Sequence, residues 1–218
     1  MFIKVNGIDL FYQQTGQGNP IILLHGNGEN HDIFDVLVKQ LAGLYTVYAI
    51  DSRDHGQSSK VNTLSYVTMM EDVASFIQEL NIQKPILYGF SDGGIIGLLL
   101  AIHYPNILSK LIVSGANYTP FGVNLKFYLK TLYTYLCTKD SKAKMILTEP
   151  NMKNKELKKI LIPTLVLAGS NDIIRKNHTK RIGKHIPNST LQFIKGENHG
   201  SYIVHSDKLY HIIVPFLK

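Results

Sequence analysis

The chain has 218 residues but only one cysteine, Cys137, and no tryptophan. A single cysteine cannot form a disulfide within the chain, and nothing points to an oxidising compartment. The longest apolar run, residues 95–102, is far shorter than the roughly 20 residues of a membrane-spanning helix. The N-terminus lacks the basic start and apolar stretch of a secretion signal. We therefore expect a cytoplasmic protein without stable membrane insertion.

Motifs for metal ions and cofactors are also missing. The sequence contains no H-E-x-x-H motif and no paired-cysteine pattern, which are common ways of holding zinc. It shows no internal repeat and no low-complexity tract. Apolar residues make up 44% of the chain, which is typical of a globular protein. We expect one domain spanning residues 1–218, with no metal ion and no organic cofactor.

Acidic residues are scarce in the second part of the chain. Residues 1–120 hold 6 Lys and Arg against 10 Asp and Glu, a net charge of −4, whereas residues 121–218 hold 17 against 6, a net charge of +11. A lysine-rich surface can attract an anionic substrate or a lipid surface, although most such surfaces are simply solvated. Nucleic acid is not an expected partner, because no recognised binding module accompanies the charge.

Apolar periodicity predicts strands that alternate with helices. Strands are expected at residues 2–5, 8–14, 21–24, 45–50, 85–88, 111–114, 163–168 and 190–194, and helices at 32–41, 64–80, 94–103, 173–182 and 201–217. Asn6-Gly7 favours a two-residue hairpin turn between the first two strands. On the helix at 64–80, one apolar face is expected to contain Val67, Met70, Val73, Phe76 and Ile77. This alternation indicates a mainly parallel sheet.

Residues 89–93, Gly-Phe-Ser-Asp-Gly, place a serine between an apolar strand and an apolar helix. This G-x-S-x-G pattern is typical of a nucleophile elbow, a turn so sharp that neighbouring backbone excludes side chains at both glycine positions. A serine hydroxyl becomes a nucleophile at neutral pH when a histidine within hydrogen-bond reach removes its proton. Ser91 is therefore the candidate nucleophile.

The candidate acid and base follow later strands, in the order Ser, Asp, His that such an elbow accompanies. Asp172 comes after the strand at 163–168, and His199 lies in a glycine-flanked loop after the strand at 190–194. Asp51 and Asp54 also follow a strand, but they precede the serine. The other histidines lie on predicted helices or polar loops, where exposed or capping roles are ordinary: His25, His31, His55, His103, His178, His185, His205 and His211.

With these motifs the chain resembles the α/β-hydrolase family over nearly its whole length. The fold implied is a mostly parallel twisted sheet with helices on both faces and a short helical cap, here at about residues 117–160, with two or three helices broken at Pro150. By resemblance, His25 is structural, and the N–H groups of Asn27 and Asp92 form an oxyanion hole. The loop at residues 51–58 departs from the family pattern at Asp54, where glycine is usual.

The resemblance implies a serine hydrolase that cleaves a small-molecule carboxylic ester, lactone or thioester through an acyl-enzyme. Within the family, the chain resembles small carboxylesterases and enol-lactone hydrolases. Cofactor-free haloperoxidases and carbon–carbon bond hydrolases use the same triad, and a ligand-binding receptor on this fold is an alternative from another class. Haloalkane dehalogenases and epoxide hydrolases are disfavoured because they place an aspartate where this chain has Ser91.

Overall fold

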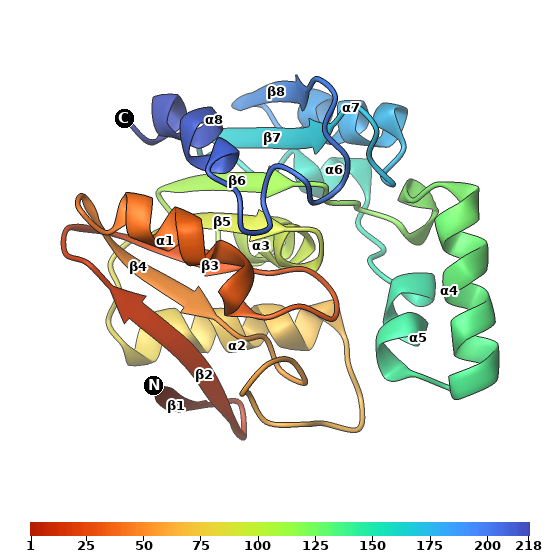
Figure 1. The fold of residues 1–218 in the computed structure, drawn as a ribbon, viewed down its shortest axis with the longest axis horizontal. Helices are drawn as coiled ribbons and strands as arrows, with labels where there is room; N and C mark the ends of the chain where they lie inside the picture. Colours follow the sequence, from red (N-terminus) through yellow and green to blue (C-terminus); the bar gives the residue numbers. More distant parts are fainter.

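The computed structural model describes the whole chain, Met1 to Lys218, and consists of one eight-stranded sheet with helices on both faces (Figure 1). The strand order is β1-β2-β4-β3-β5-β6-β7-β8. Strand β2 pairs antiparallel with β1 and β4, and every other neighbouring pair is parallel. The predicted fold class is confirmed. None of the helices combines the length and hydrophobicity needed to cross a membrane.

The predicted strands are all present, with ends that shift by at most two residues. The strands are β1 (Phe2–Val5), β2 (Ile8–Thr15), β3 (Asn19–Leu24), β4 (Tyr45–Ile50), β5 (Ile86–Phe90), β6 (Lys110–Ser114), β7 (Thr164–Gly169) and β8 (Ser189–Ile194). Asn6 and Gly7 have φ angles of 45° and 75°. Positive φ at both positions is what a tight hairpin turn between twisted strands requires.

The helices agree less closely with the sequence patterns. They are η1 (His31–Phe34), α1 (Asp35–Leu41), α2 (Tyr66–Glu79), α3 (Asp92–His103), η2 (Pro120–Gly122), α4 (Leu125–Thr138), α5 (Ser141–Thr148), α6 (Asn154–Leu157), α7 (Lys176–His185) and α8 (Lys208–Leu217). The closing helix was expected from residue 201, but residues 201–205 form turns instead. His205, with a φ of 50°, is in the left-handed region and cannot continue a right-handed helix.

Two apolar layers hold the sheet between the helices. Helices α2 and α3 cover one face, and α1 and α8 cover the other (Figure 1). In β3, Ile22 and Leu24 join the first layer, whereas Ile21 and Leu23 join the second, and all four are completely buried. A central parallel strand is therefore apolar on both faces because both are covered.

The buried face of α2 differs from the predicted one at its first turn. Met70, Val73, Phe76 and Ile77 are buried as predicted, but Val67 is exposed. Tyr66, the first residue of α2, is buried instead. Val67 follows Tyr66 and so lies at the edge of the buried face.

Residues 117–160 form η2, α4, α5 and α6. Helices α4 and α5 lie together beside the carboxyl ends of the strands, outside the main body of the sheet (Figure 1). Helix α6 instead packs against α3 and α7. Pro150 lies between α5 and α6, at the predicted break. Helices α4 and α5, the two outer helices, bring apolar side chains close to the end of β5.

Candidate active site

Ser91 stands alone between β5 and α3, since the strand ends at Phe90 and the helix begins at Asp92. Its φ of 51° and ψ of −112° lie in a region that residues with a side chain rarely adopt. Its N–H donates to the carbonyl of Ser114 on the neighbouring strand at 2.8 Å. Such strain is concentrated at functional sites, where the surrounding structure enforces it.

The two glycines of the elbow are required by close backbone packing. A Cβ atom on Gly89 would lie 2.2 Å from the carbonyl oxygen of Gly93, and one on Gly93 would lie 2.2 Å from that of Leu24. Neither approach is possible without moving the backbone. Helix α3 can therefore turn back tightly over β5 and β3 only with glycine at both positions.

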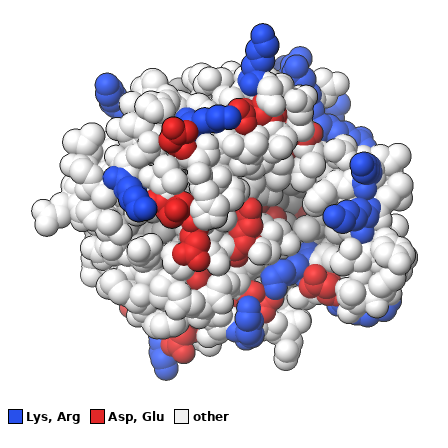
Figure 2. Space-filling model, in the orientation of Figure 1, with Lys and Arg blue, Asp and Glu red and all other residues white.

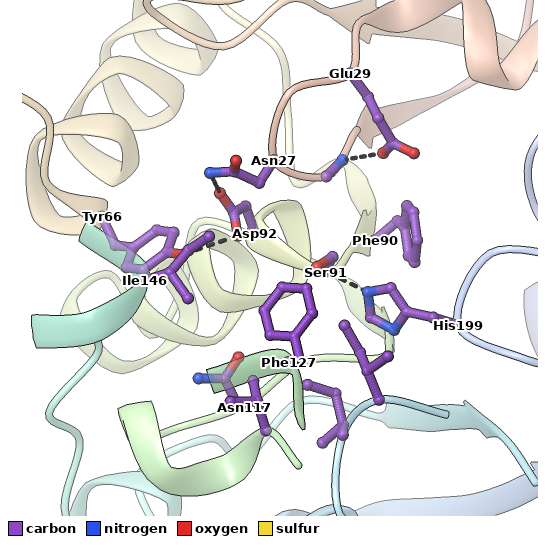
Figure 3. Close-up of a pocket in the computed structure, with 14 residues that line it drawn as sticks. Asn27, Glu29, Tyr66, Phe90, Ser91, Asp92, Asn117, Phe127, Ile146 and His199 are labelled. Atoms are coloured by element: carbon purple, nitrogen blue, oxygen red, sulfur yellow. Dashed lines mark hydrogen bonds between the residues drawn. The ribbon is translucent and has the colours of Figure 1, made fainter. Parts of the chain in front are cut away.

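The structure brings Ser91, His199 and Asp172 into one chain of hydrogen bonds. The Nε2 atom of His199 lies 3.0 Å from Ser91 Oγ, and its Nδ1 atom lies 2.7 Å from Asp172 Oδ1 (Figure 3 shows the first contact). The same carboxylate accepts N–H groups from Ile174 at 2.9 Å and Gly169 at 3.3 Å. A carboxylate oxygen accepts hydrogen bonds, so Nδ1–H of His199 is the donor in this contact, and Nε2 is then the acceptor that faces the Ser91 hydroxyl.

Two further glycines allow the loop that carries His199 to reach Ser91. A Cβ atom on Gly115, just after β6, would lie 2.7 Å from Cε1 of His199. One on Gly169, the last residue of β7, would lie 2.3 Å from the carbonyl oxygen of Asn198. The loop therefore passes directly over the ends of β6 and β7. Sequence reasoning missed both glycines, because neither belongs to the serine motif.

The backbone N–H groups of Asn27 and Asp92 stay the predicted oxyanion hole, and the structure shows what surrounds them. Asp92 is the first residue of α3, so its N–H has no acceptor within the helix. Neither N–H donates to any protein group. Both residues line the same cavity as Ser91 (Figure 3). Two backbone donors therefore remain available to a ligand oxygen.

The side chain of Asp92 has a separate role that the sequence did not indicate. It is buried and accepts hydrogen bonds from Asn27 Nδ2 at 2.9 Å and the Tyr66 hydroxyl at 2.8 Å (Figure 3). Burial raises the pKa of Asp92, while the two donors partly offset this. The N–H of Tyr66 donates in turn to Glu149, at the end of α5. This network joins the turn after β3, helices α2 and α3, and the outer helices.

A second carboxylate, that of Glu29, reaches the cavity from the loop after β3. Its Oε2 atom accepts the N–H of Gly26 at 2.9 Å. Burial raises the pKa of Glu29, and the hydrogen bond from the Gly26 N–H and the nearby His199 partly offset this. The cavity thus contains the acidic side chains of Glu29 and Asp92, and no lysine or arginine lines it.

The cavity has a volume of about 130 Å³ and is lined by both polar and apolar side chains (Figure 3). The polar lining includes Ser91, His199 and the acidic side chains. Segments outside the sheet contribute apolar lining: Val123, Phe127, Ile146, Ile173 and Ile174. Phe127 belongs to α4 and Ile146 to α5, so these helices complete the site.

Asp51 and Asp54, the two aspartates that follow a strand before Ser91, have other partners. Asp51 accepts the backbone N–H and contacts the ring of His31, and it accepts the N–H of Gln57. Asp54 has a φ of 63°, a conformation that explains why glycine is usual there, and its carboxylate pairs with Lys142 on α5. Neither carboxylate contacts His199.

Three histidines are buried and hold loops in place. His25 accepts the N–H of Ser52 on Nε2 and contacts the Gly26 carbonyl through Nδ1, and burial lowers its pKa to about 4. His55 contacts the carbonyl of Arg53, and burial lowers its pKa. The expectation of exposed or capping roles was wrong for His55 and His178, since both lie inside the protein.

His178 fixes the start of the segment that leads to α4. Its Nε2 atom accepts the N–H of Tyr118 at 3.0 Å, and the two rings stack with centroids 4.2 Å apart. Burial lowers the pKa of His178 to about 4. The ring is therefore neutral near pH 7, as an acceptor must be. No group of His, Cys, Asp and Glu side chains in the structure is arranged to hold a metal ion.

A parallel sheet with a strained serine between strand and helix, and with an aspartate and a histidine after two later strands, defines the α/β-hydrolase class of protein. Residues 19–138 match the family model described as the alpha/beta hydrolase fold, and the chain belongs to this family. The predicted family is confirmed.

Known proteins of this family include relatives that span the whole chain. The chain is 27% identical to human serine hydrolase BPHL, over 99% of this chain and 85% of that protein. Its fold is similar to that of an esterase from Exiguobacterium antarcticum, with a TM-score of 0.87, 22% identity and coverage of 99% and 98% of the two chains. It is also similar to the enol-lactonase from Burkholderia xenovorans, with a TM-score of 0.82, 17% identity and coverage of 100% and 99%.

Proposed function

We propose that this protein is a serine hydrolase that cleaves small carboxylic esters through an acyl-enzyme intermediate. The observation that carries the proposal is the continuous hydrogen-bonded chain from Ser91 through His199 to Asp172, at the wall of a cavity. Membership in a family with serine hydrolase and esterase relatives supports it. Lactones and thioesters contain the same reactive carbonyl and would follow the same steps.

The first half of the reaction forms the acyl-enzyme. Ser91 Oγ attacks the ester carbonyl carbon while His199 Nε2 takes the hydroxyl proton. Asp172 stabilises the imidazolium that results. The carbonyl oxygen becomes an oxyanion and accepts the N–H groups of Asn27 and Asp92, each such donor contributing roughly 3 to 4 kcal/mol in comparable sites. The carbon–oxygen bond to the alcohol then breaks, and His199 gives its proton to the leaving oxygen.

The second half releases the acid. A water molecule attacks the acyl carbon, and His199 takes its proton as the new bond forms. The second tetrahedral intermediate uses the same two N–H donors. It collapses by breaking the bond to Ser91 Oγ, which recovers its proton from His199. The products are a carboxylic acid and an alcohol.

The size and charge of the cavity restrict the substrate. A volume of about 130 Å³ and an apolar lining of Val, Phe and Ile side chains suit a short aliphatic acyl group. Glu29 and Asp92 disfavour a substrate that carries its own carboxylate, because like charges repel strongly in a partly buried site. We therefore propose uncharged short-chain esters over anionic ones.

The proposal is tested with p-nitrophenyl acetate and butyrate. Ser91→Ala should lower kcat by roughly four to six orders of magnitude, because the residual rate then depends on binding and the oxyanion hole alone. Ser109→Ala, an exposed serine near the opposite end of the sheet, is the matched control and should keep full activity. A fluorophosphonate should add its mass to the peptide that contains Ser91. Hydrolysis that persists in Ser91→Ala would rule the proposal out.

A further inference from the structure

The outer side of α4 carries an unusual amount of exposed apolar surface. The exposed side chains are Phe121 in η2, with 68% of its surface exposed, and Leu125 at 61%, Leu129 at 53%, Tyr133 at 70% and Leu136 at 57% on α4. The last four follow at steps of four, four and three residues, so they lie on one face of the helix. We refer to these five residues as the α4 patch. Thr131 is the only buried residue of α4.

Helix α4 is the outermost element on its side of the molecule, with α5 on its inner side (Figure 1). The inner side of α4 contributes Phe127 to the cavity, so packing there explains why the helix forms. Packing within the protein leaves the α4 patch uncovered. Soluble monomers rarely leave a contiguous apolar face of this kind open without a function, and such faces commonly mark a binding surface.

Four lysines that form no ion pair lie on α4, at its C-terminal end and on the adjoining α5. They are Lys126, Lys130, Lys139 and Lys144, and all four are exposed. The lysines that form ion pairs are Lys142 and Lys208, so none of these four is neutralised by a carboxylate. Helix α4 itself contains no aspartate or glutamate. Figure 2 shows Lys and Arg side chains on this side of the molecule, over α4 and α7.

From these observations we propose that the α4 patch and its four lysines bind the surface of an anionic phospholipid bilayer. Apolar side chains on one face of a helix enter the boundary between headgroups and acyl chains, and flanking lysines are attracted to anionic headgroups. A second copy of the chain is a poorer occupant. A symmetric contact through the patch would bring the same unpaired lysines of both copies together.

The proposed surface lies on the back of the helix that lines the cavity. Binding by the α4 patch would hold the protein at the bilayer surface, with α4 between the bilayer and the site, without inserting any element across the bilayer. The inference does not depend on the proposed hydrolysis, because none of the residues involved contacts Ser91. Vesicle binding should therefore be unchanged in Ser91→Ala.

The absence of tryptophan makes a direct test possible, because any introduced tryptophan is the only one in the chain. Leu129→Trp places the probe in the α4 patch. Leu44→Trp is the matched control, since Leu44 is 69% exposed and lies before β4, at the opposite end of the strands. Vesicles of phosphatidylcholine mixed with equal phosphatidylglycerol should shift the emission of the first probe to shorter wavelength and leave the second unchanged.

Sedimentation of the unmodified protein with the same vesicles gives a second measurement that needs no probe. Replacing Lys126, Lys130, Lys139 and Lys144 by glutamine should weaken this binding by roughly tenfold or more. Phosphatidylcholine alone should bind little protein. Far-UV circular dichroism and urea denaturation, which need no enzymatic activity, show that each variant is folded.

Three results would overturn the proposal. The first is failure of the unmodified protein to sediment with anionic vesicles. The second is equal binding to phosphatidylcholine alone, or equal emission shifts from positions 129 and 44. The third is an emission shift from position 129 that needs only high protein concentration and accompanies a doubled mass in analytical ultracentrifugation, which would assign the patch to a second copy.

Discussion

The Nε2 atom of His199 lies 3.0 Å from the Oγ atom of Ser91, although 108 residues separate them along the chain. Ser91 follows β5 and His199 follows β8, and β6 and β7 lie between these strands. Three strand spacings amount to about 14 Å. The loop after β8 must therefore cross the ends of β7 and β6, and Gly169 and Gly115 leave room for it.

Gly115→Ala should damage the site without touching any group that reacts. Gly115 has a φ of 61°, and an added Cβ atom would meet the ring of His199 at 2.7 Å. We expect ester hydrolysis to fall at least tenfold and the free energy of unfolding to fall by roughly 1 to 3 kcal/mol. Gly43→Ala, where a Cβ atom meets nothing within 4 Å, is the control for both measurements. Full activity in Gly115→Ala would mean that the ring position is not critical.

Asp172→Asn should leave the fold intact and lower kcat by about 10⁴-fold. The amide keeps the size of the carboxylate, but its NH₂ group cannot accept the proton of His199 Nδ1. The amide would instead donate to Nδ1, so the proton of the imidazole would lie on Nε2. Nε2 could then no longer accept a hydrogen bond from Ser91. Steady-state kinetics with p-nitrophenyl butyrate measure the change, and urea denaturation checks the fold. A loss of less than tenfold would contradict the assigned role of Asp172.

Glu29→Gln should change the choice between neutral and anionic substrates. The carboxylate of Glu29 lines the cavity, and burial raises its pKa. Removing its charge should raise kcat/KM for the p-nitrophenyl monoester of succinic acid by roughly tenfold relative to p-nitrophenyl butyrate. Glu79→Gln, an exposed acidic residue at the end of α2, should leave this ratio unchanged. An unchanged ratio in Glu29→Gln would show that the site does not sense its charge.

His178 should make the protein less stable as the pH falls. Burial lowers its pKa from 6.5 to about 4 in the folded state, so between these values the unfolded chain binds more protons. The stability from neutral His178 is complete above about pH 6.5 and is lost towards pH 4, by up to about 3 kcal/mol.

The measurement for His178 is urea denaturation at about pH 7 and pH 4.5. His178→Gln should lose less stability between these values than the unmodified protein, because glutamine can accept the Tyr118 N–H without titrating. His25 retains its own contribution, so some dependence remains. His211→Gln replaces an exposed histidine and should keep the original dependence. An identical dependence in His178→Gln would contradict the argument.

The sequence predicted the sheet well because strand and turn signals are local. The apolar runs of the central strands and the Asn6-Gly7 turn require no knowledge of distant residues. The closing helix was placed too early because an apolar stretch cannot reveal that His205 adopts a left-handed conformation. Val67 was assigned to the buried face because it lies three residues before Met70, but helical spacing cannot show how much of the first turn of α2 the rest of the protein covers.

Some residues of the candidate site could be predicted from the sequence, and others could not. Ser91, Asp172 and His199 could be predicted to lie together because each follows a strand, and the carboxyl ends of parallel strands share one edge of the sheet. Tyr66, Glu29 and Gly115 were not found, because each acts through a partner that is distant in sequence or through the space that it leaves empty.

The amino-acid order alone determined the alternation of strands and helices and the serine between two glycines, since short-range sterics and apolar periodicity decide both. Only the tertiary structure decided which side chains share the cavity, that Asp92 is held by Asn27 and Tyr66, and that the face of α4 opposite Phe127 is left uncovered. These features depend on how elements pack against one another, and packing is a property of three-dimensional distances that no local pattern contains.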